Sequence, residues 1–255
     1  MNMDVYKEIT KLNRYRDPDM SDEAQEFYNN YFSWFKLEGM RGDTICSFGT
    51  CFGVCNKNSS KELVVLNDGP NWKRGYTKEL FSGNKKENIL IFRKRYHSLA
   101  NFWVMPQTLN SWRGMDDMSA NLPAQGDFFD VFLECVRNYY LDNKLNPITV
   151  VNKFEEENIK IWLYSFGKGE NGWYQFIIKN YLRMFVNGDF LVKDIFGHNY
   201  QIDNSEIIGT YHEYGKALPQ NTKSQTVNKS IINYVNNSLW ILDQRGKALL
   251  EECIN

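Results

Sequence analysis

Aromatic side chains recur at helical spacing in several separate parts of this chain, and this pattern constrains the fold more than any other feature. Aromatic residues make up 15% of the 255 residues. Many of them follow one another at intervals of three or four positions, which places them on one face of a helix. Such stripes run through Phe27, Tyr28, Tyr31 and Phe35, through Phe128, Phe132, Tyr139 and Tyr140, and through Phe154, Trp162 and Phe166. The chain is therefore expected to bury a large core built from the aromatic faces of helices.

The same spacing predicts a set of helices of ordinary length and one long helix at the C-terminal end. Ser21 is a good N-cap for the second of them. The segment at 173–186 is apolar on nearly all sides, so it is expected to be a buried central helix. Gly246 lies inside the long helix and weakens it by about 1 kcal/mol relative to Ala. The predicted helices cover residues 3–14, 22–36, 127–141, 153–166, 173–186 and 224–253.

Three short β-leaning segments predict a small sheet. They cover residues 44–55, 63–66 and 89–94, and the turn sequence Asn67–Pro70 ends the second of them. We expect them to pair antiparallel, because no helix of crossover length separates the first two. Further short strands are expected between residues 190 and 214.

Together these elements predict an α+β fold, with a small antiparallel sheet packed against several aromatic-rich helices and a long C-terminal helix. No internal repeat or low-complexity tract divides the sequence, so residues 1–255 are expected to form a single domain. The polar run from Pro219 to Lys223 is the best linker, and a weak boundary is therefore placed near residues 219–224, before the C-terminal helix.

The charge balance and hydropathy exclude some classes of protein. Lys and Arg number 30 and Asp and Glu number 31, so the formal net charge is −1. This argues against attraction of the whole chain to nucleic acid or to an anionic membrane, but it leaves room for a local basic patch. The N-terminal segment is charged, so no signal peptide is expected, and no apolar run approaches the roughly 18 residues of a membrane span. With five cysteines and no secretion signal, we expect reduced thiols, a cytoplasmic location and no membrane partner.

The stretch from residue 89 to residue 114 carries the best candidate site, because it joins core residues to many hydrogen-bonding side chains. If residues 89–94 form a strand, alternate side chains share one face of it. That face begins with isoleucines and continues through Arg93, Arg95 and His97. It therefore changes from apolar to cationic at the C-terminal end of the strand.

Ser98 is expected to begin a short helix that ends at Met105–Pro106. The first N–H groups of such a helix point back toward the arginines, and this combination favours an anion such as phosphate or carboxylate. Polar side chains of the helix and of the following loop complete the wall of the site. The predicted ligand-binding residues are Arg93, Arg95, Asn101, Gln107, Asn110 and Arg113.

Structural alternatives stay open for these residues. The two arginines can instead pair with nearby carboxylates and hold the following loop in place. His97 can act as a general base that one of these carboxylates orients, or it can be a hydrogen-bonded structural histidine. The carboxylates in question are Asp116 and Asp117 and, for the arginines, also Asp127.

Three cysteines form an incomplete metal-binding pattern. Cys46, Cys51 and Cys55 have spacings that occur in zinc sites, but a fourth ligand would have to come from His97 or Cys135. Buried cysteines in strands explain the same residues, so no metal is predicted. No phosphate-binding loop, dinucleotide-binding glycine motif or zinc-protease motif occurs, so no cofactor is predicted either.

Residues 92–114, in particular Tyr96–Phe102 (YHSLANF) and Met105–Pro106, resemble a family of uncharacterised bacterial and phage proteins that is described as a domain of unknown function. Asp17–Asp19 and the aromatic helix after it resemble the N-terminal pattern of that family. The family has a glycine-containing turn after Met-Pro, where this chain has Gln107–Asn110. The resemblance implies that the stretch is a coherent unit, and it implies no activity and no catalytic residue.

The sequence favours a binding protein for a phosphate-bearing ligand, either a nucleotide or a segment of nucleic acid, held around Arg93, Arg95 and Arg113. The abundance of Asn, Lys, Ile and Tyr fits an AT-rich genome, and it suggests a setting in bacterial defence or phage counter-defence. One alternative is a hydrolase or transferase that acts on a phosphorylated or nucleotide substrate, with His97 as the base. Another is a protein–protein interaction module that uses the C-terminal helix, with a protein partner.

Overall fold

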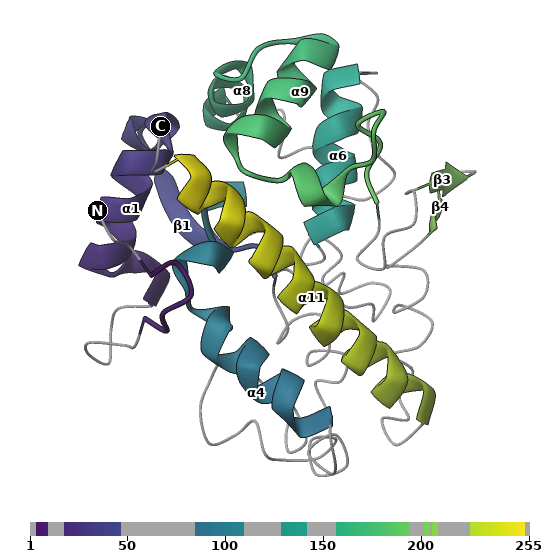
Figure 1. The fold of residues 1–255 in the computed structure, drawn as a ribbon. Helices are drawn as coiled ribbons and strands as arrows, with labels where there is room; N and C mark the ends of the chain where they lie inside the picture. Colours follow the sequence, from purple (N-terminus) through teal and green to yellow (C-terminus); the bar gives the residue numbers. More distant parts are fainter. Residues whose placement is uncertain are drawn as a thin grey trace, which may run out of the picture.

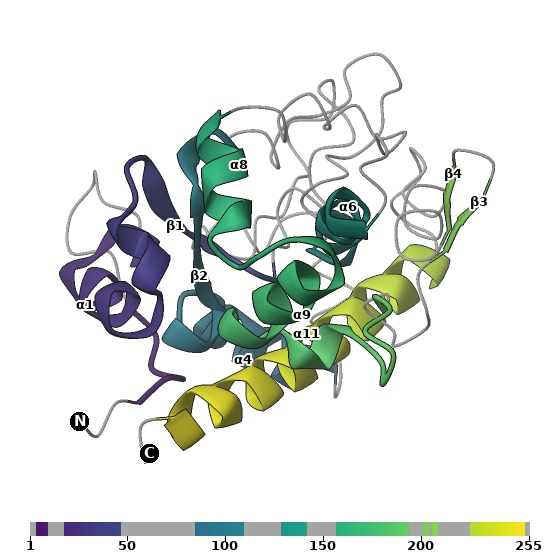
Figure 2. The ribbon, with the colours of Figure 1, turned by 90° about the horizontal axis from the view of Figure 1, so that it is seen from above.

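The computed structural model describes residues 4–9, 18–46, 85–109, 129–141, 157–193, 201–203, 206–208 and 225–252. These segments form an α+β fold, as predicted, in which helices surround a small antiparallel sheet (Figures 1 and 2). The beginning of the chain and the C-terminal end of the last helix lie at the same side of the molecule. Within the described segments, none of the helices combines the length and the apolar character that crossing a bilayer requires.

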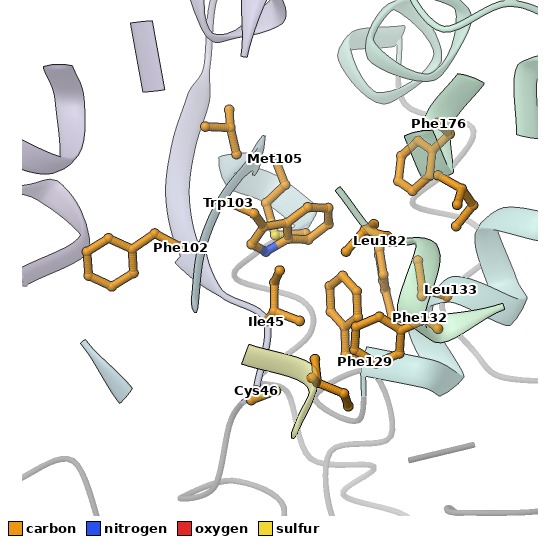
Figure 3. Close-up of a cluster of buried hydrophobic side chains, with 14 of the residues drawn as sticks. Ile45, Cys46, Phe102, Trp103, Met105, Phe129, Phe132, Leu133, Phe176 and Leu182 are labelled. Atoms are coloured by element: carbon orange, nitrogen blue, oxygen red, sulfur yellow. The ribbon is translucent and has the colours of Figure 1, made fainter. Parts of the chain in front are cut away.

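The sheet pairs β1 (Met40–Thr44) with β2 (Phe102–Pro106), in a register that runs from Met40 opposite Pro106 to Thr44 opposite Phe102. All five residues of β2 are buried. Adjacent strand residues face opposite sides, and Phe102 contacts Tyr28 of α1 (Asp22–Tyr31) while Trp103 contacts α6 (Phe129–Leu141). The sheet therefore lies between α1 on one side and a second group of helices on the other (Figures 2 and 3).

Trp103 is at the centre of the aromatic core on that second side (Figure 3). Its ring centroid lies 5.0 Å from that of Phe129 and 6.2 Å from that of Trp162 in α8 (Glu157–Tyr164). Trp162 in turn lies 5.5 Å from Phe176 in α9 (Gly169–Lys179). These are edge-to-face arrangements, which aromatic pairs prefer over face-to-face stacking. The core thus confirms the expected packing of aromatic helix faces.

The long C-terminal helix is α11 (Gln225–Glu252), and it runs along α4 (Lys85–Tyr96) (Figure 1). Asn88 of α4 donates a hydrogen bond of 2.9 Å to Asn236 of α11. Further along, α11 packs against the short 3-10 helices η4 (Leu99–Asn101) and η6 (Arg183–Phe185). Among the side chains of α11 that the structure describes, the buried apolar ones are Tyr234, Val235, Ile241, Leu242 and Leu249.

Two elements of the sequence prediction are wrong around the candidate site. Residues 89–94 belong to helix α4 rather than to a strand, because Ile89, Phe92 and Tyr96 are buried at helical spacing. Ser98 precedes only the short 3-10 helix η4, and residues 102–106, which were expected to continue the helix, form β2. Its continuous apolar run has no periodicity that distinguishes a buried strand from a buried helix.

Other predictions have mixed outcomes. Residues 4–9 contain no helix, and the first strand ends at Thr44 rather than beginning there. Ser21 is the N-cap of α1, where its hydroxyl accepts a 3.1 Å hydrogen bond from the Ala24 N–H. Two short strands, β3 (Gln201–Asp203) and β4 (Glu206–Ile208), pair antiparallel in the region expected to hold strands. The predicted strand at 63–66 lies outside the described residues.

Candidate functional site

The residues predicted as one anion site lie in different surroundings, because α4 is a helix. Alternate positions of a strand share a face, whereas alternate positions of an α-helix point about 200° apart. Arg95 already has partners. Its Nη1 lies 2.5 Å from Oδ1 of Asp243 in α11, and its guanidinium lies 4.9 Å from the ring centroid of Tyr6. An internal ion pair was the structural alternative for Arg95, although the carboxylate is Asp243 and not one from the loop. The side chain of Arg93 is outside the described part.

Asn101 is fully buried and uses its amide to hold two chain segments together. Its oxygen accepts a 2.8 Å hydrogen bond from the Cys46 N–H. Its nitrogen donates to the carbonyl oxygens of Cys46, at 3.2 Å, and Tyr96, at 2.8 Å. The Asn101 amide therefore ties the chain that leaves β1 to the end of α4.

The remaining predicted residues are not brought together with Arg95 and Asn101 in any described pocket. The half-buried ring of His97 packs against Tyr96 and Phe102, at centroid distances of 4.8 and 6.4 Å. Its role as a base stays a prediction. Gln107 is exposed, and its N–H donates to the Gly39 carbonyl at 2.8 Å. Asn110 and Arg113, and the carboxylates at 116, 117 and 127, lie outside the described residues.

The cysteines give no metal centre that can be described. Cys46 and Cys135 are both buried, and Cys51 and Cys55 lie outside the described residues. No group of three or more potential metal ligands occurs among the segments that the structure describes. Burial raises the pKa of the Cys135 thiol well above its usual range, so this thiol is protonated at neutral pH.

A groove of about 610 Å³ lies at another corner of the molecule, between α1 with the 3-10 helix η2 (Ser33–Lys36) and the end of α9 with η6. Ala248, near the C-terminal end of α11, also lines the groove. Three cations line the groove: Lys36 ends η2, Lys179 ends α9 and Arg183 begins η6. As far as the described residues go, its lining contains no Asp or Glu.

The wall that α1 and η2 form supplies polar groups and aromatic rings. Trp34 is buried, and its indole N–H donates to the Val104 carbonyl at 3.4 Å, which fixes this wall to β2. The other lining residues of this wall are exposed or half-buried, so a ligand in the groove can reach them. They are Asn29, Asn30, Tyr31 and Ser33.

The opposite wall depends on an unusual helix end. The N–H groups of Tyr181 and Leu182 donate to the carbonyls of Ile178 and Ile177, both at 3.0 Å, which is the Schellman pattern that ends many helices. Its left-handed position usually holds Gly, but here it holds Tyr181 with φ 57°. The Tyr181 ring lies 6.1 Å from the ring of Tyr31 across the groove. Backbone strain of this kind costs on the order of 1 kcal/mol and clusters at functional sites.

A tight turn holds Arg183 on the same side. The guanidinium lies 4.1 Å from the ring centroid of Phe190, and Nη1 donates to the Asn187 carbonyl at 3.3 Å. Asn187 Oδ1 in turn accepts from the N–H groups of Asp189 and Leu191, both at 2.9 Å. Phe190 has φ 59°, and it shares this left-handed conformation with Tyr181 alone among the described non-glycine residues. Two strained aromatic residues therefore flank Arg183.

The charged side chains in the described lining of the groove are all positive. Lys36, Lys179 and Arg183 are all exposed, and within the described segments none of them forms an ion pair with a carboxylate. Burial, and then the charge of Arg183, lower the pKa of nearby Lys193. Among the described residues the groove lining thus carries positive charge and no carboxylate, which suits it to bind an anion.

A second hollow of about 440 Å³ lies beside α9 and differs in charge. It is lined by Arg137, Glu170 and Asp189, and Arg137 pairs with Glu134 at 3.1 Å. Two carboxylates at its wall disfavour phosphate. The groove is therefore the better candidate for a phosphate-bearing ligand.

Sequence reasoning missed the groove because Lys36, on one of its walls, is more than 140 residues away from Lys179 and Arg183 on the other. The segment at 173–186 was expected to be buried on nearly all sides. Instead α9 ends at Lys179, and Ile178 is 40% exposed beside the groove. The one local signal was the alternation of basic and aromatic residues from Lys179 to Phe185.

Comparison of the chain with protein-family models, with curated proteins and with solved structures gives no match. The resemblance based on Tyr96–Phe102 and Met105–Pro106 therefore stays a prediction. The groove has to be interpreted from its own chemistry.

Proposed function

We propose that this protein binds a phosphate-bearing ligand, a nucleotide or a segment of nucleic acid, in the groove between α1 and the end of α9. The observation that carries the proposal is the set of three exposed cations, Lys36, Lys179 and Arg183, around a described lining without carboxylates. An anion that enters the groove finds cations on both of its walls and breaks no described ion pair.

Arg183 supports this proposal by its geometry. Stacking on Phe190 orients the guanidinium before any ligand arrives, so less side-chain freedom is lost on binding. A guanidinium has five N–H donors, and within the described segments only Nη1 of Arg183 donates a hydrogen bond, to the Asn187 carbonyl. The other donors suit the bidentate recognition of phosphate oxygens.

The rest of the groove favours a nucleotide over a bare phosphate ion. Small-molecule sites commonly enclose about 300–1,000 Å³, and this groove has about 610 Å³. The rings of Tyr31 and Tyr181 offer apolar contact for a base, and the amides of Asn29 and Asn30 offer hydrogen bonds for a base or a sugar.

This location differs from the one that the sequence suggested around Arg93, Arg95 and Arg113. The internal partners of Arg95 support a structural role for it. The variant Arg93→Ala/Arg95→Ala separates the two locations, because it removes the first site and leaves the groove intact. The enzyme alternative with His97 as base, and the setting in defence or counter-defence, stay predictions.

Thermal unfolding with inorganic phosphate and with nucleoside monophosphates tests the proposal. At a ligand concentration about 100 times Kd, the Tm of the wild type should rise by about 5–10 °C. Lys179→Gln/Arg183→Gln should lose this rise. The control Lys94→Gln/Lys168→Gln makes the same change in charge at exposed positions outside the groove lining, and it should keep the rise.

Two outcomes would contradict the proposal. If no phosphate-bearing ligand stabilises the wild type, the protein has no such site. If both double variants lose the stabilisation equally, the effect reflects total charge and not the groove.

A further inference from the structure

An exposed tryptophan lies on α11, the helix whose Ala248 also lines the cationic groove. Trp240 on α11 is 49% exposed, although large aromatic side chains are usually mostly buried. The Lys193 ammonium lies 5.8 Å from the centroid of its ring. A cation and an aromatic face are thus presented side by side at the surface.

Lys193 joins this tryptophan to the groove. Its N–H donates to the Phe185 carbonyl at 2.8 Å, which ties it to η6, the element that begins with Arg183. The charge of Arg183 contributes to the lowered pKa of Lys193, so the two cations are close enough to interact. Among the described residues, neither cation forms an ion pair with a carboxylate. The positive surface therefore continues from the groove through Arg183 and Lys193 to Trp240.

We infer that the ligand is single-stranded nucleic acid, whose phosphates contact Arg183 and Lys193 while a base stacks on Trp240. The inference rests on the proposed function and names the class of its ligand. Proteins that bind single strands combine a positively charged groove with aromatic rings on which bases stack. The surface from the groove to Trp240 has both parts.

A mononucleotide does not account for this arrangement. It would fill the groove and leave Lys193 and Trp240 without a ligand. A duplex does not account for it either, because its bases are stacked inside and present no face to an indole. Trp240 precedes Ala248 of the groove lining by eight residues of α11, which is about 12 Å along the helix, so a strand of a few nucleotides can contact both.

The test measures binding of a fluorescein-labelled oligothymidylate of about ten nucleotides by fluorescence anisotropy, with thymidine 5′-monophosphate measured by thermal shift in parallel. Trp240→Ala should weaken oligonucleotide binding about tenfold, since one stacked base contributes an effect of this size. It should leave stabilisation by the mononucleotide unchanged. Trp240→Phe keeps a ring for stacking and should bind nearly as the wild type does.

Tyr164 provides a matched control. It is 48% exposed, and Lys168 lies over its ring at 5.1 Å, so it forms a similar cation–aromatic pair on α8, outside the lining of the groove. Tyr164→Ala should not change oligonucleotide binding. If it weakens binding as much as Trp240→Ala does, stacking at Trp240 is not the cause and the inference is wrong.

The outcomes separate this inference from the proposed function. In one outcome, mononucleotide binding requires Lys179 and Arg183, but the oligonucleotide binds no more tightly than the mononucleotide, or binds Trp240→Ala as tightly as the wild type. This outcome overturns the single-strand inference and leaves the proposed function in place. A duplex that binds as tightly as the single strand also overturns it. If neither the mononucleotide nor the oligonucleotide binds, both proposals fail.

Discussion

The ring of Tyr6 fills the space next to Gly246 that a β-carbon would otherwise occupy. A Cβ built at position 246 would lie 2.5 Å from Cζ of Tyr6. The Tyr6 hydroxyl donates to the Asp243 carbonyl at 3.1 Å, and Arg95 lies over the ring. The glycine inside the long helix α11 is therefore needed for docking of the N-terminal segment.

Gly246→Ala should consequently give no stabilisation in the wild-type background. In an ordinary helix this change stabilises by about 1 kcal/mol, but here it displaces Tyr6 and its contacts. In a Tyr6→Ala background the obstacle is absent, and the full gain of about 1 kcal/mol should return. Urea unfolding of the four proteins measures this coupling. An equal gain in both backgrounds would show that the Tyr6 ring moves aside without cost.

Gly246 and helix α4 illustrate which features of this fold follow from the sequence and which do not. The aromatic helices and α11 were predictable because one apolar face repeats every three or four residues. The sequence also showed that Gly246 weakens α11, but its purpose depends on Tyr6, which is more than 200 residues away. In α4 the continuous apolar run of residues 89–92 hid the helical spacing of the buried side chains, so a strand was predicted. The shared face of Arg93, Arg95 and His97 was derived from that strand.

The groove lies beyond such prediction for a different reason. Its cations, Lys36, Lys179 and Arg183, come together only when the end of α9 turns back toward α1. That turn uses Tyr181 in a backbone conformation that sequence rules assign to Gly. A local pattern therefore could not place Lys36 opposite Lys179 and Arg183.

At Arg245 the contribution of packing to stability can be separated from the contribution of charge. It is fully buried, and Nη1 donates to the carbonyls of Ala100, at 2.7 Å, and Leu99, at 3.4 Å. In the described part of the chain Nε and Nη2 have no hydrogen-bond partner. Burial lowers the pKa of the guanidinium to about 9, so it is still charged at neutral pH. Its stabilising contribution should come mostly from the volume that it fills.

Arg245→Met keeps most of that volume and removes a buried charge, so we expect its stability to lie within about 1 kcal/mol of the wild type. Arg245→Ala leaves a cavity and should cost about 2–4 kcal/mol. The matching pair at the exposed neighbour, Lys247→Met and Lys247→Ala, should change stability by less than about 0.5 kcal/mol. Equal losses for Met and Ala at position 245 would mean that the hydrogen bonds to Leu99 and Ala100 dominate.

Stability should fall at alkaline pH because buried acids keep their protons in the folded state. Burial raises the pKa of the Cys135 thiol above its ordinary value of 9.0 and that of the Tyr140 phenol above 10.0. Above these values the unfolded chain releases protons that the folded chain retains, so the free energy of unfolding decreases as pH rises. This contribution is fully present below pH 9 and is lost progressively above it.

Cys135→Ala should flatten the decline from pH 9 upward by about 1.4 kcal/mol per pH unit, which corresponds to one proton. Tyr140→Phe should flatten it only from pH 10 upward, although it also removes the hydrogen bond from the Tyr140 hydroxyl to the Leu163 carbonyl. Urea unfolding at a series of pH values resolves the two onsets. A Cys135→Ala protein with an unchanged slope would show that this thiol ionises in the folded state.

The left-handed conformation of Tyr181 can be tested by comparing two substitutions at one position. Both Tyr181→Gly and Tyr181→Ala remove the ring and its contact with Tyr31. Only Gly also relieves the positive φ, so the Gly variant should be more stable than the Ala variant by about 1 kcal/mol.

Tyr174 supplies the control, because it is 44% exposed inside α9 and its backbone is helical. There the order should reverse, with Tyr174→Gly less stable than Tyr174→Ala by about 1 kcal/mol. Thermal and urea unfolding measure both pairs. If Ala is the more stable residue at both positions, the turn at Tyr181 relaxes at no cost. The backbone strain would then no longer support a functional role for this wall of the groove.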